Sequence, residues 1–192
     1  YGSAKSLALC NVVRNNNSPI VLMVADVKSM ENAFEEINFY QNDIEDVPLL
    51  SFPDWETLPY DTFSPYQDII SDRLQTLTKL SSFKRGLLIV PISTVMHRLM
   101  PVNYLLSRSF SMTVGETLDI ESLKAKLSEN GYRHVAQVME HGDYASRGSI
   151  LDLFPMGSDK PFRIDLLDNT IDSMRIFDPE TQKSIKKIQD IK

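Results

Sequence analysis

The sequence predicts an α/β protein in which a parallel-sheet domain is followed by a smaller α+β domain with an antiparallel meander. In the first half, short apolar runs such as Ile20–Ala25 and Leu87–Val90 alternate with helical patterns, which is typical of strands buried on both faces of a parallel sheet. In the second half, Pro161–Leu167 alternates apolar and polar residues, as a strand with one buried face does. We expect the two domains to cover residues 1–108 and 109–192.

Composition limits the classes of protein to consider. The chain has 192 residues, a formal net charge of −6 and a single cysteine, Cys10, so it has neither an internal disulfide framework nor a cysteine-cluster metal site. The acidic balance argues against broad electrostatic capture of nucleic acid, which requires Lys and Arg to neutralise phosphates. Without a visible signal peptide or membrane span, we expect a cytoplasmic protein with no membrane partner. Its abrupt ends suggest a fragment of a longer protein.

The first domain is expected to alternate helices and short strands, because helical spacing of apolar residues alternates with compact apolar runs. The expected elements are a helix ending at Arg14, a strand at Ile20–Ala25, a helix at Ser29–Tyr40, a strand at Val47–Phe52, a helix at Gln67–Leu80, a strand at Leu87–Val90 and a helix from Ser93 to about Leu99.

The connection Pro53–Pro65 is rich in proline and aromatic residues. Its aromatic side chains and the one that follows could form a stacking platform for bases: Trp55, Tyr60, Phe63 and Tyr66. No Lys or Arg occurs from Pro53 to Asp72, however, so we expect the aromatic residues to pack the loop. Asp72 and Arg73 are interpreted as a surface or interdomain salt bridge rather than a catalytic pair.

The segment Gly2–Ser6 resembles the tail of a phosphate-binding loop, with Lys5 and Ser6 in the Lys and Ser/Thr places. Ala4 stands where the last glycine of that loop belongs, and its Cβ obstructs the backbone turn that cradles phosphate. The sequence therefore favours an ordinary helix N-terminus capped by Ser3.

The metal-binding half of a nucleotide site is also missing from the sequence. An ATP hydrolase needs a carboxylate at the end of a buried strand to hold Mg²⁺, and Pro91 stands there instead. The three histidines show no metal-ligand spacing: His97, His134 and His141. We expect no catalytic residue, no metal and no cofactor in this chain.

The second domain is expected to contain one helix and a meander separated by Pro, Gly, Asp and Asn turns. After a short helical or irregular piece at Pro101–Ser107, the expected elements are a strand at Ser109–Val114, a helix at Asp119–Asn130, an edge segment at Tyr132–Met139, strands at Ser149–Phe154, Pro161–Leu167 and Ile171–Phe177, and a last strand at Ser184–Ile191.

One face of this meander mixes charge with an apolar residue. Arg163 and Leu167 lie on the same side of their strand, and Arg147, just before Gly148, could join them. Arginines beside a hydrophobic residue have the composition of a protein-binding hot spot. Composition alone favours a solvated sheet face with one exposed leucine.

Three stretches of sequence carry a family resemblance. The first is Tyr144-x-x-Arg147-Gly148-x-x-x-Asp152-x-Phe154-Pro155, followed by Arg163-x-Asp165 and Asp168-x-x-Ile171-Asp172-Ser173. It resembles the UvrB-type domain that docks onto UvrA in bacterial nucleotide excision repair. The stretches Asp54–Pro65 and Gly131–Gly142 narrow the resemblance to the N-terminal region of transcription-repair coupling factors (Mfd).

This resemblance implies a degenerate RecA-like domain, similar to domain 1a of UvrB, and a UvrA-binding domain similar to UvrB domain 2. It assigns UvrA contacts to Arg147, Arg163 and Leu167, although family members can carry Phe at the third position. It also implies intramolecular contacts with the rest of a longer protein, an ATP-dependent DNA translocase whose other domains contact RNA polymerase and DNA. The alternative is an active ATP-dependent helicase domain that binds nucleotide and damaged DNA.

Overall fold

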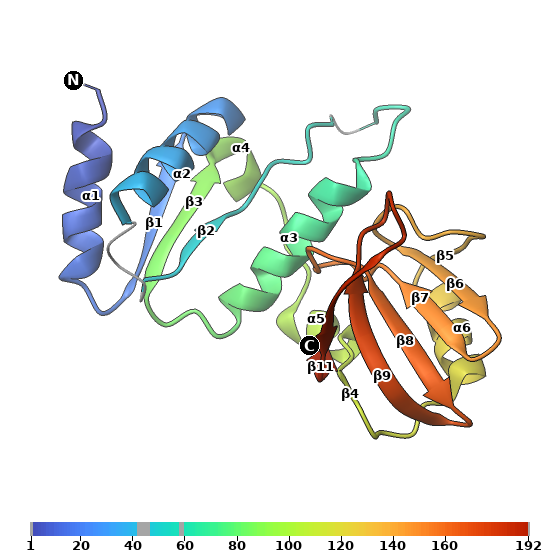
Figure 1. The fold of residues 1–192 in the computed structure, drawn as a ribbon. Coiled ribbons are helices and arrows are strands. Elements are labelled where there is room, and N and C mark those ends of the chain that lie inside the picture. Colours follow the sequence, from blue (N-terminus) through green and yellow to red (C-terminus); the bar gives the residue numbers. More distant parts are fainter. Residues whose placement is uncertain (1, 42–46, 58–59, 192) are drawn as a thin grey trace. The chain divides into compact units, whose positions relative to one another are not determined.

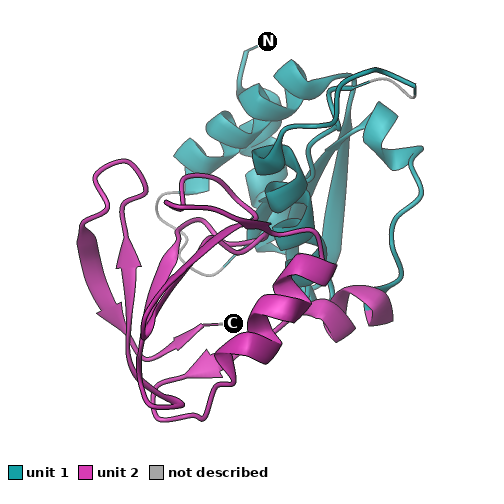
Figure 2. Cartoon of the chain, turned by 90° about the vertical axis from the view of Figure 1, so that its right-hand side faces the viewer, with its two compact units in different colours: residues 1–102 teal, residues 103–192 magenta. Residues whose placement is uncertain are grey.

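The structure, a computed structural model, describes residues 2–41, 47–57 and 60–191 (Figure 1). The chain divides into two compact units, residues 1–102 and 103–192 (Figure 2). The sequence predicted the limits 1–108 and 109–192, which assign the short helix α5 (Val102–Arg108) to the first domain. These domain limits stay a prediction. None of the described helices combines the length and hydrophobicity needed to cross a membrane.

The first unit contains a parallel sheet, as predicted, with strand order β1–β3–β2. Its strands are β1 (Pro19–Val24), β2 (Leu49–Ser51) and β3 (Gly86–Pro91). Its helices are α1 (Ala4–Arg14), α2 (Val27–Gln41), α3 (Gln67–Leu80) and α4 (Ile92–Val95). Buried side chains from α1, α2 and β3 form the core of this unit, including Cys10, Val13, Ile37, Leu87 and Ile89.

The prediction that the first strand is buried on both faces is wrong. Val21 and Met23 of β1 are more than half exposed, and only the alternate residues of the strand are partly buried. This alternation shows that one face of β1, an edge strand of the sheet, is not covered within the first unit. The prediction holds for β3, the central strand, where Leu87, Ile89 and Val90 are buried.

Arg73 on α3 is buried, so the surface alternative of the predicted surface or interdomain salt bridge is wrong for this residue. Its guanidinium carbon lies 4.2 Å from the centre of the Phe52 ring and 4.0 Å from that of Trp55, and it donates a hydrogen bond to the carbonyl of Pro53. Cation–π contacts and this hydrogen bond compensate for the lost hydration of the charge. Arg73 therefore anchors the start of the connection after β2.

The other aromatic residues of that connection do not pack it as predicted. Tyr60, Phe63 and Tyr66 are exposed, and Trp55 alone of the four predicted aromatic residues stacks on Arg73. The predicted connection also includes residues 58 and 59, which lie outside the described residues.

The second unit is built on a six-stranded sheet with the order β10–β9–β8–β7–β6–β5. Its strands are β5 (Arg133–His134), β6 (Asp143–Arg147), β7 (Ile150–Leu153), β8 (Phe162–Leu167), β9 (Thr170–Phe177) and β10 (Ser184–Ile188). Pairing is antiparallel from β6 to β10, which confirms the predicted meander, whereas β5 is parallel to β6. A separate pair consists of β4 (Met112–Thr113) and β11 (Asp190–Ile191).

The sequence did not predict β6, and it predicted several strands too long. The segment expected at Tyr132–Met139 pairs only over the two residues of β5. The last predicted strand, Ser184–Ile191, is divided into β10 and β11, which pair with different strands.

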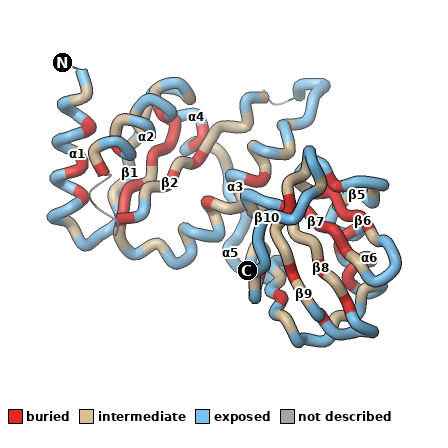
Figure 3. Tube along the Cα trace, viewed as in Figure 1, coloured by how far each residue is buried: buried red, intermediate tan, exposed pale blue. Residues whose placement is uncertain are grey.

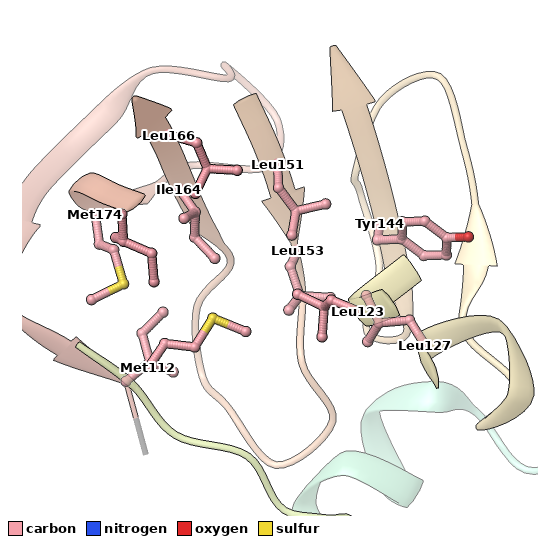
Figure 4. Close-up of a cluster of buried hydrophobic side chains, with 11 residues drawn as sticks. Met112, Leu123, Leu127, Tyr144, Leu151, Leu153, Ile164, Leu166 and Met174 are labelled. Atoms are coloured by element: carbon pink, nitrogen blue, oxygen red, sulfur yellow. The ribbon is translucent and has the colours of Figure 1, made fainter. Parts of the chain in front are cut away.

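The core of the second unit lies between the sheet and the helix α6 (Ile120–Glu129) (Figure 4). Asp119 caps α6 as predicted, because its carboxylate accepts hydrogen bonds from the backbone N–H groups of Glu121 and Ser122. Leu123 and Leu127 of the helix pack against sheet residues, including Leu151, Leu153, Ile164 and Met174. The predicted fold class, a parallel α/β unit followed by an α+β unit with a meander, is thus confirmed.

Candidate partner-binding site

Two tight turns position the three residues that the sequence singled out. β6 ends at Arg147, and Gly148 then adopts a φ of 59° at the turn into β7. β8 ends at Leu167, and Asp168 adopts a φ of 55° at the turn into β9. Glycine and aspartate tolerate this left-handed backbone, and such turns fix the register of a hairpin. The turns therefore decide which face of the sheet each side chain occupies.

The cross-strand register places Arg147, Arg163 and Leu167 on one face, which we call the polar face. One row across this face contains Ala145, Asp152, Arg163, Arg175 and Lys187. The neighbouring row contains Arg147, Ile150, Asp165 and Ser173. Leu167 follows Asp165 by two positions on β8 and pairs with Thr170. The opposite face carries the buried Ile164 and Leu166, as the alternation predicted.

Of the two arginines among the three predicted residues, Arg147 is the more exposed to solvent. Its side chain is exposed, and its Nη2 donates a hydrogen bond to the carbonyl of Ala136. Among the described residues, no carboxylate forms an ion pair with it. Its positive charge is therefore not neutralised within the part of the chain that the structure describes.

Arg163 is held much more firmly. Its Nε lies 2.7 Å from Asp152 Oδ1 and its Nη2 lies 2.8 Å from Asp152 Oδ2, while Nη1 donates to the carbonyl of Gln182 at 3.2 Å. The guanidinium also lies 4.7 Å from the centre of the Phe177 ring. The hydrogen bonds that Arg163 donates to the Asp152 carboxylate raise the pKa of Arg163 above its ordinary value.

This environment corrects the idea that Arg163 lies freely on a solvated face. Its side chain is only 20% exposed, and that of Asp152 is 10% exposed. A guanidinium has five N–H groups, of which three are occupied here, so about two remain for a partner.

Part of the polar face is covered by residues 135–142, which we call the covering loop. Val138 of this loop is fully buried against Ala145, Phe154 and Phe177, forming a small second core. The side-chain amide of Gln182 donates a hydrogen bond to the carbonyl of Val138 at 3.1 Å. The covering loop explains why Arg163 and Asp152 have little exposure, and the sequence did not predict it.

Leu167 remains open to solvent. Its side chain is 68% exposed, whereas the preceding Leu166 is buried in the core. An exposed apolar side chain on a sheet face that also carries an exposed cation is suited to contact another protein. The structure therefore places Arg147 and Leu167 at the accessible part of the polar face and Arg163 at its partly covered part.

The residues of the predicted phosphate-binding tail are arranged as an ordinary helix start. Ser6 is buried and donates a hydrogen bond of 2.6 Å to the carboxylate of Glu36 on α2, while Lys5 is exposed. Ser3 does not cap α1 as predicted, because its hydroxyl is bonded to Tyr40 instead, at 2.6 Å. A carboxylate beside Ser6 repels the phosphate and competes for the hydroxyl that a nucleotide site would need.

Within residues 2–41, 47–57 and 60–191, no group of three or more His, Cys, Asp or Glu side chains is arranged to hold a metal ion. His141 stacks on Phe154 with 4.0 Å between ring centres, and its Nε2 lies 2.8 Å from the carbonyl of Ser158.

The sheet geometry described above agrees with comparisons to known proteins. Residues 110–192 match the family described as the UvrB interaction domain. The second unit of this chain therefore belongs to the UvrB interaction domains.

The similarity to individual proteins extends over both units. The chain is 42% identical to the transcription-repair-coupling factor of Escherichia coli K12 over 99% of its own length, and 45% identical to that of Haemophilus influenzae over 98%. It is 36% identical to the Staphylococcus aureus MRSA252 factor over 80% of its length. It spans only 16% of the length of the first two relatives and 14% of the third. The chain is thus related, along nearly its whole length, to one segment of the transcription-repair-coupling factors.

Proposed function

We propose that this chain is a protein-docking module that recruits UvrA through the polar face. The observation that carries the proposal is the exposure on one sheet face of the apolar Leu167 and of Arg147, a cation that no carboxylate of the described residues pairs with. The match to the UvrB interaction domain and the relationship to transcription-repair-coupling factors support the same function. The longer protein would link stalled RNA polymerase to nucleotide excision repair.

The three residues have different roles in this proposal. Arg147 offers a guanidinium that can form a bidentate pair with a partner carboxylate. Leu167 supplies an apolar anchor that excludes water around that pair. Arg163 presents its two remaining N–H groups from a fixed position, because Asp152 and Gln182 hold the rest of its guanidinium. A partner therefore meets a surface that is already ordered, which lowers the entropic cost of binding.

We also propose that this chain does not hydrolyse ATP and that the first unit is structural. Ala4 in place of a glycine, the Ser6–Glu36 hydrogen bond and Pro91 at the end of β3 support this. The rival function, an ATP-dependent helicase domain, would need those positions for phosphate and Mg²⁺. DNA translocation and the contacts with DNA and RNA polymerase would belong to other parts of a longer, cytoplasmic protein, which would also contact this module intramolecularly. The proposed domain limits are 1–108 and 109–192.

The test is a binding titration of this chain with purified UvrA from the same organism. Arg147→Ala and Leu167→Ala should each weaken binding by about 2 kcal/mol, roughly thirtyfold, if they are hot-spot residues. Arg98→Ala is the matched control, since Arg98 is an exposed arginine in the first unit. If Arg147→Glu and Leu167→Ala each bind UvrA with wild-type affinity, the docking surface lies elsewhere.

A further inference from the structure

The row of the polar face that contains Arg163 continues beyond the three proposed docking residues. Arg163 pairs in register with Arg175 on β9, and Arg175 pairs with Lys187 on β10. Cross-strand neighbours of this kind lie on the same face of a sheet, about 5 Å apart. Asp152 pairs with Arg163 and Asp165 forms an ion pair with Arg175, whereas no carboxylate of the described residues forms an ion pair with Lys187, so the unpaired positive charge lies at the β10 end of the row.

A shallow, open hollow of about 430 Å³ lies over this end of the sheet, and it is lined by Arg175, Ser184, Ile185, Lys186 and Lys187. Ile185 is 59% exposed and occupies the point where the pairing of β10 with β9 shifts between Ser184 and Lys186. Figure 3 shows that β10 is the most exposed strand of this part of the sheet. The hollow thus combines an exposed apolar side chain with three cationic residues.

Arg175 adds a second observation at the same place. Its Nη2 lies 2.7 Å from Asp165 Oδ2 and 3.2 Å from the Ser173 hydroxyl. Its Nε, by contrast, is buried and has no hydrogen-bond partner in the described part of the chain. A buried donor without an acceptor is costly.

We infer that this hollow extends the docking surface and receives an acidic, extended segment of the partner. Carboxylates of that segment pair with Lys187 and reach Arg175, while an apolar side chain of the segment covers Ile185. The inference rests on the proposed function, because it assigns the segment to the same partner, UvrA. It deepens that function by stating the chemistry of a second contact, on β9 and β10 rather than on β6 and β8.

Lysines on an edge strand have a simpler role, which is to prevent pairing with a sheet of another molecule. That role accounts for Lys186 and Lys187. It does not account for the exposed isoleucine at the bulge, nor for the unsatisfied Nε of Arg175. The irregular pairing of β10 also makes addition of a further strand unfavourable, so the segment is expected to lie across the face of the hollow.

The experiment is a titration of purified UvrA with this chain and its Lys187→Glu and Ile185→Ser variants at two salt concentrations. Lys126→Glu is the matched control, because Lys126 is an exposed lysine on α6, the helix that packs on the opposite face of the sheet. We expect Lys187→Glu to lose about tenfold in affinity relative to Lys126→Glu, with a smaller dependence on salt. Ile185→Ser should lose affinity without any change in salt dependence, and both should keep the wild-type thermal midpoint.

The outcomes separate this inference from the proposed function. If Lys187→Glu and Ile185→Ser both bind as tightly as Lys126→Glu while Arg147→Glu loses binding, the hollow is not a contact and the inference is overturned, but the proposed function stands. If the wild-type chain does not bind UvrA, both are overturned. A loss of affinity in both variants at unchanged thermal stability supports the second contact.

Discussion

The guanidinium of Arg163 and the carboxylate of Asp152 form a two-point ion pair across neighbouring strands, with donor–acceptor distances of 2.7 and 2.8 Å. Asp152 is buried, with 7% of the residue exposed, and the covering loop lies over this part of the sheet. Removal of either partner would leave the other charge in a poorly hydrated position. The pair is therefore part of the fold of the second unit as well as of its proposed docking surface.

Arg163→Ala is expected to lower the free energy of unfolding by about 2 kcal/mol, because it leaves the buried Asp152 carboxylate without its partner. Urea unfolding monitored by circular dichroism measures the change. Arg147→Ala is the control, since an exposed arginine bonded to one carbonyl should change stability by less than about 0.5 kcal/mol. Equal stability of the two variants would mean that the ion pair does not support the fold.

The double variant Asp152→Ala/Arg163→Ala should be less destabilised than the sum of the two single variants. Each single change leaves an unpaired charge, whereas the double change removes both charges together. A double-mutant cycle on unfolding free energies measures this coupling, which we expect to be about 1 kcal/mol or more. Additive effects would contradict a direct energetic interaction between the two side chains.

Arg163→Glu should weaken UvrA binding more than Arg163→Ala does, because the glutamate places like charges opposite each other at the interface. Affinity has to be compared at a temperature where both variants are folded, since both lose the Asp152 pair. If Arg163→Glu folds and binds UvrA with wild-type affinity, the polar face is not the docking surface.

The exposed members of the site were predictable from sequence because they depend on local rules. Period-2 alternation in β8 placed Ile164 in the core and Leu167 on the outside, and both positions are confirmed. Gly148 and Asp168 mark the turns that end β6 and β8. The burial of Arg163 was not predictable, because it depends on the covering loop and on the register between β7 and β8, whose connecting loop has no standard turn length.

The errors in the predicted fold also concern features that depend on contacts between residues far apart in the sequence. β6 has the sequence Asp-Tyr-Ala-Ser-Arg, without the apolar run or strict alternation that marks a strand, and its burial comes from the covering loop on one face and α6 on the other. The exposure of Val21 and Met23 depends on the order of strands in the sheet. Asp119 and the apolar spacing of α6 are local signals, and that helix was predicted within two residues at either end.

Ile164→Ala should destabilise the second unit by about 2–4 kcal/mol, because Ile164 is fully buried between the sheet and α6 and the smaller side chain leaves a cavity. Chemical unfolding measures the change. Binding of UvrA should remain normal at a temperature where the variant is folded, since Ile164 lies on the opposite face from Arg147. Loss of affinity in the folded variant would contradict the assignment of the two faces.

The chain should show no saturable binding of Mg-ATP in titration calorimetry. Ser6 is bonded to Glu36, and the carboxylate would oppose the negative charge of a phosphate at the start of α1. Lys5→Ala serves as the control for a nucleotide site that uses the predicted lysine. Binding in the micromolar range that Lys5→Ala abolishes would show that the site is functional.

Asp54 links the connection after β2 to the segment around α4. Its carboxylate accepts a hydrogen bond from the Ser93 hydroxyl and one of 2.8 Å from the backbone of Trp55, and it lies 3.8 Å from Nδ1 of His97. Burial raises the pKa of Asp54, but these hydrogen bonds and the electrostatic influence of the neighbouring His97 and Arg73 side chains outweigh it, so the pKa lies below its ordinary value of 3.8. Folding therefore favours the ionised carboxylate.

Asp54→Asn should lower the stability of the first unit at neutral pH, by an amount on the order of 1 kcal/mol. A lowered pKa in the folded state stabilises the protein above the pKa of the unfolded chain, and this stabilisation is lost as the pH falls through the folded value. The difference in unfolding free energy between wild type and Asp54→Asn should therefore be largest near neutral pH. It should shrink in acid, below the ordinary pKa of 3.8. Urea unfolding followed by the fluorescence of Trp55, the single tryptophan, measures this difference in unfolding free energy at each pH. A difference between wild type and Asp54→Asn that widens in acid would contradict the assigned direction of the pKa shift.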